Sequence, residues 1–138
     1  MTFILSAAII FIFLGTSVSG LFGSMKNVTV KGQLGCGGKS YPNIKIQLWE
    51  DDTWGLDDLL NETTSARDGH FRVYGQTKEI RNIEPYLIIE HHCDNGLLNP
   101  QCKIRDRYDV PKEFQGRTYD MGIVSLNIAS RKHKKYCD

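Results

Sequence analysis

The four cysteines are the feature that most limits how this chain can fold. They are Cys36, Cys93, Cys102 and Cys137, and all lie downstream of an apolar N-terminal segment. An even cysteine count in a short exported chain is typical of disulfides, so we expect two structural bridges. Four cysteines allow three connectivities, and the sequence alone does not choose among them. A metal site is the weaker interpretation, because the cysteines are widely spaced and form no CxxC pair.

The apolar segment itself resembles a secretory signal peptide. Residues 3–18 are almost continuously apolar, and small residues follow up to Gly20. This run is short for a membrane span, which needs about 20 apolar residues. We therefore expect cleavage of residues 1–20 and a secreted, extracellular domain over residues 21–138 without a transmembrane span. An uncleaved anchor is the alternative, because the segment lacks the usual basic residue near its start.

Alternation of apolar and polar residues predicts an all-β fold. Strands are predicted over residues 28–34, 44–48, 59–66, 71–75, 86–92, 102–110 and 119–129. Residues 67–69 carry a turn signal that predicts a hairpin between the strands on either side. No segment keeps a helical period for more than about a turn, so we expect an antiparallel two-sheet β-sandwich of seven or eight strands.

Two adjacent histidines, His91 and His92, end the most apolar strand. Neighbours on a strand point to opposite faces, so these two side chains cannot bind one metal ion together. The parity of Leu87 and Ile89 places His91 inside, hydrogen-bonded near the disulfides, and His92 outside. A zinc site with His70 lacks four convergent ligands. We therefore expect no catalytic, cofactor or metal site.

Charge is segregated along the chain, although the formal net charge is only +1. Residues 50–62 are acidic but lack the ligand spacing of an EF-hand, so bound calcium is a minor interpretation. The C-terminal tail carries Arg131, Lys132, Lys134 and Lys135. A solvated terminus is favoured there over contact with anionic membranes or glycans. The near-neutral total argues against a nucleic-acid partner.

Two further sets of residues suggest surface roles. Asn27 and Asn61 begin glycosylation sequons, which predict a glycoprotein and require both asparagines to be exposed. Trp49, Tyr74 and Tyr86 are expected to be exposed. They would form an aromatic recognition surface or pack beneath loops, and the sequence leaves both alternatives open.

Specific segments resemble the transthyretin-like proteins of nematodes over nearly the whole predicted mature chain. They are VTVKGQLGCGGK, LWEDD, DDLLNETTSARDGHF, PYLIIEHHC, CKIRDRYDVP and YDMGIVSLNI, followed by a terminal cysteine. The resemblance implies a transthyretin-like sandwich in which the loop of Cys36 and the loop between Cys93 and Cys102 lie at one end. The last strand would finish at the opposite end. A bridge to Cys137 would then require the residues after Ile128 to run back along the surface.

The resemblance also suggests which functions to consider. A sister branch of this fold hydrolyses 5-hydroxyisourate with histidines, an arginine and a C-terminal Tyr-Arg-Gly-Ser. This chain ends in Lys-Tyr-Cys-Asp, and residues 28–34 contain no histidine. Fold alone does not transfer a function whose site is missing, so we do not expect an enzyme. We expect a non-catalytic binding module for an extracellular protein or cell-surface ligand, with carriage of a small apolar or lipid ligand as the alternative.

Overall fold

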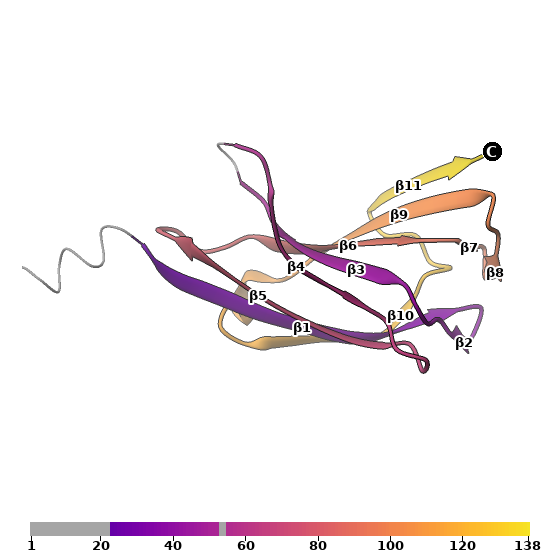
Figure 1. The fold of residues 1–138 in the computed structure, drawn as a ribbon, viewed down its shortest axis with the longest axis horizontal. Helices are drawn as coiled ribbons and strands as arrows, with labels where there is room; N and C mark the ends of the chain where they lie inside the picture. The colour runs from indigo at the N-terminus through magenta and orange to yellow at the C-terminus, as the bar shows by residue number, and fades with distance from the viewer. Residues whose placement is uncertain (1–22, 53–54) are drawn as a thin grey trace, which may run out of the picture.

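A computed structural model describes residues 23–52 and 55–138, which form two facing β-sheets (Figure 1). The predicted signal peptide, residues 1–20, lies outside the described residues. The first sheet contains β10 (Thr118–Ser125), β1 (Ser24–Cys36), β5 (His70–Glu79) and the two-residue β2 (Lys39–Ser40). β1 is central to this sheet because it pairs with all three of the others.

The second sheet has five strands and carries the most apolar segment at its centre. Its order is β11 (Lys132–Cys137), β9 (Cys102–Asp109), β6 (Pro85–His91), β3 (Lys45–Glu50) and β4 (Asp58–Thr64). All its pairings are antiparallel. The predicted sandwich is confirmed, with one departure from antiparallel order, since β1 and β10 run parallel.

Short elements complete one end of the sandwich and one crossing between the sheets. β7 (Cys93–Asp94) and β8 (Leu97–Leu98) form a two-stranded ribbon after β6. The 3-10 turn η1 (Lys112–Phe114) lies on the crossing from β9 to β10. Figure 1 shows β2, β7, β8 and the C-terminus at the same end of the molecule.

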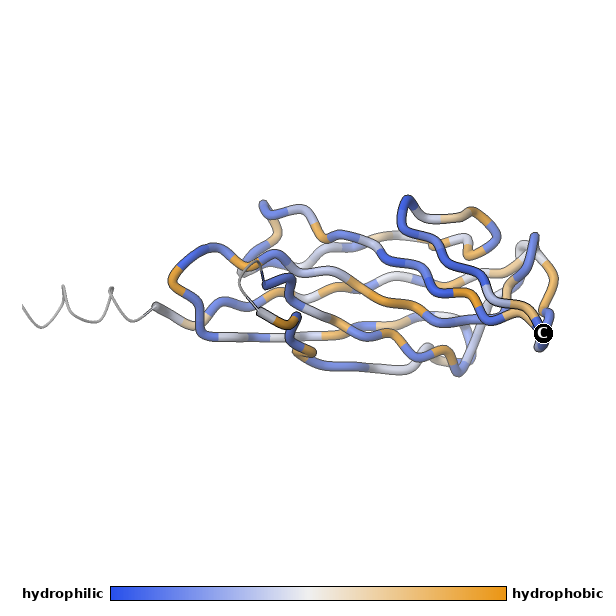
Figure 2. Tube along the Cα trace, turned by 90° about the horizontal axis from the view of Figure 1, so that it is seen from above, coloured by the Kyte–Doolittle hydropathy of each residue, from blue (hydrophilic) through white to orange (hydrophobic). Residues whose placement is uncertain are grey.

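The core lies between the two sheets and follows the predicted period of two. Along the strands, apolar and polar residues alternate in the tube of Figure 2. The fully buried side chains include Val28, Val30, Leu34, Ile46, Leu48, Leu87, Ile89 and Ile104. Burying each such aliphatic side chain contributes about 1.5–3 kcal/mol, so this inner face supplies the main drive for folding.

The predicted hairpin at residues 67–69 is wrong in its pairing, although its turn is present. Gly69 N–H donates to Ala66 O over 2.8 Å, and Gly69 has a φ of 85°, which suits glycine. β4 then pairs with β3, whereas β5 pairs with β1 in the other sheet. The turn therefore connects strands of two different sheets, and the strands on either side of it do not form a hairpin.

The structure selects one of the three disulfide connectivities. Cys36 is bonded to Cys93, which joins the end of β1 to the ribbon that follows β6, and Cys102 is bonded to Cys137. The loops of Cys36 and Cys93 thus meet at one end of the sandwich, as the resemblance implied. The prediction that the last sandwich strand finishes at the opposite end is wrong, because β10 runs parallel to β1 and ends with Ser125 beside Gly35. The tail reaches Cys102 through the β11–β9 ladder, in which Cys137 lies opposite Cys102.

Removing the Cys102–Cys137 bridge with C102A/C137A should lower the free energy of unfolding by about 2–4 kcal/mol, because the bridge restricts the unfolded chain. It should also speed hydrogen exchange of the β11 amides, measured by mass spectrometry. The control C36A/C93A removes the other bridge and should leave β11 exchange slow relative to C102A/C137A. Equal β11 exchange in both variants would contradict a specific role of the second bridge at this edge.

Candidate functional site

The predicted basic tail is an ordered strand, β11, whose lysines point to two faces. Lys132 and Lys134 lie on the outer face of the five-stranded sheet, since their ladder partners on β9 face outward. Lys135 has the opposite parity, and its Nζ donates to Asp94 Oδ1 over 2.6 Å. Arg131 precedes the strand and is exposed. The tail is therefore an ordered strand whose residues are all exposed to solvent.

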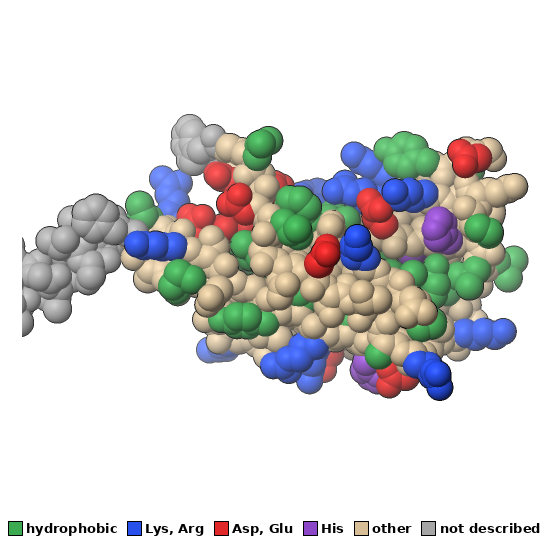
Figure 3. All heavy atoms as spheres, in the orientation of Figure 1, with side chains coloured by type: hydrophobic (Ala, Val, Ile, Leu, Met, Phe, Trp, Pro, Cys, Tyr) green, Lys and Arg blue, Asp and Glu red, His purple; other side chains and the backbone are tan. Residues whose placement is uncertain are grey.

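The outward cations of β9 and β11 form one surface, which we call the basic strip. Its members are Lys103, Arg105, Arg107, Lys132 and Lys134. Arg107 faces Lys132, and Arg105 faces Lys134, so each cross-strand pair joins like charges. Such pairs are destabilising. Figure 3 shows the blue side chains gathered over β9 and β11.

Counter-charges border the basic strip on its β6 side. Glu90 Oε2 lies 3.2 Å from Lys103 Nζ, and Glu90 Oε1 lies 4.0 Å from Arg105 Nε. Within residues 23–52 and 55–138, Lys132 and Lys134 form no ion pair. Uncompensated positive charge therefore increases toward the β11 edge.

Sequence reasoning identified the β11 part of the strip and missed the β9 part. Lys103, Arg105 and Arg107 recur at every second position within CKIRDRYD, which is the period of side chains on one face of a strand. That signal was available. What the sequence did not provide was the β9–β11 pairing that joins the two rows.

Tyr86 is buried, so its predicted exposure is wrong. It does point outward, but the Arg107 guanidinium carbon lies 3.7 Å from its ring centroid. Its hydroxyl donates to Asp57 in the loop after β3. Arg107 also contacts Asp51 at 3.3 Å and Asp109 at 2.8 Å. Burial and the contact with Asp57 raise the pKa of Tyr86.

The other two predicted aromatics occupy different faces of the molecule. Trp49 is half-buried beside Tyr86, and its Nε1 donates to Gln47 Oε1 over 3.1 Å. Tyr74 is exposed on the first sheet, where its hydroxyl donates to Gln76 Oε1. The three aromatic residues therefore do not form a single recognition surface.

His91 points inward and His92 is exposed, as strand parity predicted. The N–H of Cys93 donates to His91 Nδ1 over 3.0 Å, so the proton of this neutral ring is on Nε2. Nε2 donates to Asp106 Oδ2 over 2.7 Å. His92 Nδ1 donates to the Cys102 carbonyl over 2.7 Å. The adjacent histidines thus serve separate structural contacts.

Asp106 is the most heavily bonded buried group of the five-stranded sheet. Besides His91, its carboxylate accepts from His133 Nδ1 at 2.7 Å, from the Ser130 hydroxyl at 2.8 Å and from Ser130 N–H at 3.1 Å. Burial alone would raise the pKa of Asp106. The hydrogen bonds from His91, His133 and Ser130 outweigh burial and hold that pKa well below its ordinary value of 3.8.

The acidic residues 50–62 do not assemble into a metal site. In the described part of the chain, no group of three or more His, Cys, Asp or Glu side chains is arranged to hold a metal ion. Glu50, the last residue of β3, is buried, and its Oε2 has no hydrogen-bond partner. Burial and the nearby carboxylates of Glu79, Asp58 and Asp52 raise the pKa of Glu50 to about 7.

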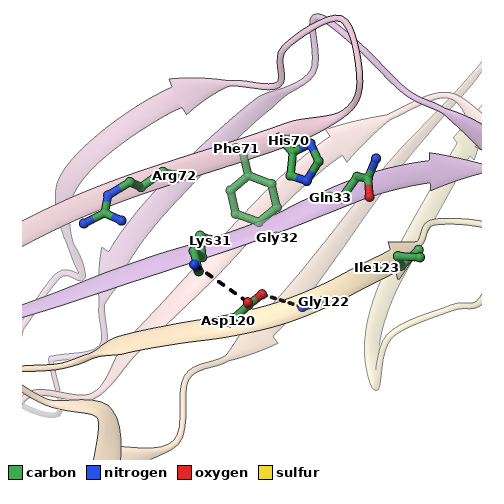
Figure 4. Close-up of a pocket in the computed structure, with 9 residues that line it drawn as sticks. All are labelled: Lys31, Gly32, Gln33, His70, Phe71, Arg72, Asp120, Gly122 and Ile123. Atoms are coloured by element: carbon green, nitrogen blue, oxygen red, sulfur yellow. Dashed lines mark hydrogen bonds and ion pairs between the residues drawn. The ribbon is translucent and has the colours of Figure 1, made fainter.

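A shallow hollow of about 290 Å³ lies on the outer face of the first sheet (Figure 4). His70 and Arg72 from β5 and Lys31 from β1 line it, together with Asp120 from β10. His70 Nδ1 lies 2.9 Å from Asp68 Oδ2, but both side chains are more than half exposed. Water therefore screens this pair, and His91 and His92 do not line the hollow.

The two sequons differ in accessibility. Asn61 is exposed on β4, where its Nδ2 donates to the Tyr74 carbonyl over 2.7 Å. Asn27 is half-buried on β1, and Thr29 of the same sequon is buried. The requirement for an exposed asparagine is thus met at Asn61 and not at Asn27. Glycosylation itself stays a prediction.

Comparison with known proteins decides the family. A model described as "TTR-52: Transthyretin-like family" matches residues 31–111. Transthyretin-like protein 16 of Caenorhabditis elegans is 42% identical over 113 residues, which cover 82% of this chain and 84% of that protein. The chain belongs to the transthyretin-like family.

A second relative agrees with this assignment. Transthyretin-like protein 33 of Caenorhabditis elegans is 37% identical over 115 residues, covering 78% of this transthyretin-like chain and 79% of the relative. A crystal structure of a 9R-lipoxygenase from Cyanothece PCC8801 is similar with a TM-score of 0.46 and 18% identity, covering 73% of this chain and 16% of that one. The family model and the two Caenorhabditis elegans relatives confirm the resemblance stated from the sequence motifs.

The variant Asp106→Asn should lower the free energy of unfolding at pH 7 by about 3 kcal/mol, because it leaves buried donors of His91 and Ser130 unpaired. A depressed folded pKa contributes stability above the ordinary value of 3.8 that is lost as pH falls below it. The difference from the unmodified protein should therefore shrink at pH 3. Urea unfolding at pH 7, 5 and 3 measures it.

The exposed Asp120→Asn variant is the control and should change stability by less than about 0.5 kcal/mol. Equal stability of Asp106→Asn and the unmodified protein at pH 7 would contradict the structural role of Asp106. A difference that stayed constant down to pH 3 would contradict its depressed pKa.

Proposed function

We propose that this transthyretin-like chain is a secreted, non-catalytic recognition module that binds an extracellular protein or cell-surface partner through the basic strip. The observation that carries the proposal is the two pairs of facing cations on β9 and β11. Repulsion between them works against the fold. An anionic partner would convert this unfavourable arrangement into a favourable one, which gives the strip a function in binding.

Secretion is supported by covalent chemistry as well as by the apolar segment at residues 3–18. Both disulfides join segments far apart in the chain, and such bridges persist in oxidising compartments. No helix within residues 23–52 and 55–138 has the length and apolar character needed to cross a bilayer.

The hydrogen bonds and the surroundings of two histidines support the proposal that the protein is non-catalytic. Both ring nitrogens of His91 are engaged, one with Cys93 N–H and one with Asp106. A general base needs a free nitrogen within reach of a substrate proton. His70 has a carboxylate partner, but the pair is exposed on an open face, without the water exclusion that strengthens acid–base chemistry.

Binding of the fluorescently labelled, oxidised domain to nematode cells tests the recognition proposal. The variant K132E/K134E should bind with an affinity reduced at least about ten-fold, because charge reversal makes the strip repel an anionic partner. The control R67E/K78E reverses two exposed cations outside the strip and should bind normally. Flow cytometry at several concentrations gives the apparent Kd. Equal binding by both variants would refute a role for the strip.

A groove at the disulfide end supports the second candidate function, carriage of a small apolar or lipid ligand. The groove has a volume of about 480 Å³ and is lined by Tyr41, Pro42, Leu97 and Leu98, among others. Leu97 and Leu98 are 75% and 61% exposed. This volume is within the range of small-molecule sites, about 300–1,000 Å³.

A fluorescent fatty acid tests carriage. If the groove binds lipid, L97S/L98S should weaken binding about ten-fold, since two apolar contacts are lost. The control Leu56→Ser changes another exposed leucine, away from the groove, and should bind like the unmodified protein. Absence of saturable binding by the unmodified protein would remove this candidate.

A further inference from the structure

The arrangement of the basic strip indicates more about its partner than positive charge alone. Edge strands often carry lysines that prevent pairing with other chains, and this accounts for lysines on β11. It does not account for Lys103 and Arg105, because β9 is paired on both sides, with β6 and β11. Edge protection therefore does not explain these two cations, which lie beside the single carboxylate of Glu90 on β6.

The strip is held rigidly in spite of its internal repulsion. The Cys102–Cys137 bridge fixes one end of the β9–β11 ladder. Nearer the other end, His133 donates to the buried Asp106 carboxylate. Both contacts set the register that places Lys132 and Lys134 opposite arginines. The cations are thus positioned before a partner arrives, which reduces the entropic cost of binding.

The spacing of the strip suits a chain with regularly repeated anionic groups. Outward residues on one strand recur about every 6.6–6.8 Å, and neighbouring strands lie about 4.8 Å apart. Lys103, Arg105 and Arg107 form one row, and Lys132 and Lys134 form the second. The strip is therefore elongated along the strands and only two strands wide.

The border of the strip favours a linear polyanion over a membrane plane. Glu90 lies directly beside the strip on β6, and Glu62 lies farther across the same face on β4. A flat anionic bilayer over this face would also meet these carboxylates. A single linear chain can follow the two cationic rows from Tyr136 as far as Lys132 and avoid Glu90 and Glu62, since Asp109 lies beyond Arg107 at the end of the β9 row.

Tyr136 adds a contact suited to a sugar. It faces Lys103 at the end of the strip and is 63% exposed. A tyrosine ring offers an apolar face with a polar tip, which matches the mixed surface of a pyranose ring. No comparable aromatic contact is required by a simple array of phosphates.

We propose that the basic strip binds a linear sulfated polysaccharide, with sulfate groups paired to Lys132, Lys134 and Arg105 and a sugar ring against Tyr136. This inference rests on the proposed recognition function and specifies its partner. Sulfate and guanidinium or ammonium groups form charge-assisted hydrogen bonds, so affinity should depend strongly on salt.

The test uses heparin as the probe and the oxidised full domain. The unmodified protein should bind immobilised heparin, and K132Q/K134Q should bind about ten-fold more weakly. The slope of log Kd against log salt should fall by about two, one for each removed cation, if counterion release applies. The same variant should have a raised Tm, because the facing repulsion is relieved. Tyr136→Ala should weaken binding without changing the slope.

The controls distinguish a sulfated polysaccharide from other anionic ligands. They also distinguish failure of the polysaccharide proposal from failure of the recognition proposal. R67Q/K78Q, which removes two exposed cations outside the strip, should bind heparin normally, and desulfated heparin should not bind. Equal or tighter binding to phosphatidylserine vesicles or to a single-stranded oligonucleotide would overturn the polysaccharide assignment. Cell binding that needs the strip but persists after enzymatic removal of sulfated glycans would also overturn it, while leaving the recognition function intact. Cell binding that does not need the strip would refute the recognition proposal itself.

Discussion

The buried carboxylate of Asp106 is the interaction on which the position of the last strand depends. β11 offers only lysines, His133, Tyr136 and Cys137, and all six of its residues are exposed. Hydrophobic burial therefore cannot fix this strand to the sheet. The ladder with β9 and the Cys102–Cys137 bridge hold the strand along its length and at its end. Asp106 fixes the start of the strand by accepting from His133 and from Ser130, while His91 holds the carboxylate from β6. Four hydrogen bonds offset the cost of burying its charge.

The placement of β11 determines which surface the molecule presents. The chain leaves β10 in the first sheet and crosses to the edge of the second, beside β9. Without that crossing, the outward row Lys103, Arg105 and Arg107 would lie at a sheet edge with Glu90 and other carboxylates as neighbours. With it, a second cationic row is added. The same contacts that stabilise the edge therefore create the repulsive array.

Local pattern predicted much of the fold because each strand must bury one face. The period of two gave the strands near residues 28–34, 44–48 and 86–92, and it placed His91 inside. This period does not show which strands pair with each other. β4 and β5 are joined by a genuine turn at Gly69, yet they pair in different sheets, since pairing depends on contacts distant in sequence. The pairing of the polar β11 is likewise set by long-range contacts.

A side chain that points outward from a sheet is not always exposed to solvent, and the outer face of the second sheet gives an example. Tyr86 has outward parity, but Arg107 covers its ring and Asp57 binds its hydroxyl. The candidate site could be predicted only in part for the same reason. Lys132 and Lys134 were identified as basic residues, whereas their arrangement opposite Arg107 and Arg105 depends on the ladder register.

The formal net charge of +1 conceals a strong separation of charge. Carboxylates gather around Glu50 and Glu79, where they raise the pKa of Glu50 to about 7. Cations gather on the outer face of β9 and β11. Arg107 lies between these regions, since it belongs to the basic strip and also contacts Asp51. A near-neutral total argues against a long phosphate-tracking surface. It does not argue against a short anionic ligand that contacts one strip, because charge screening confines its interactions to within about 8–10 Å.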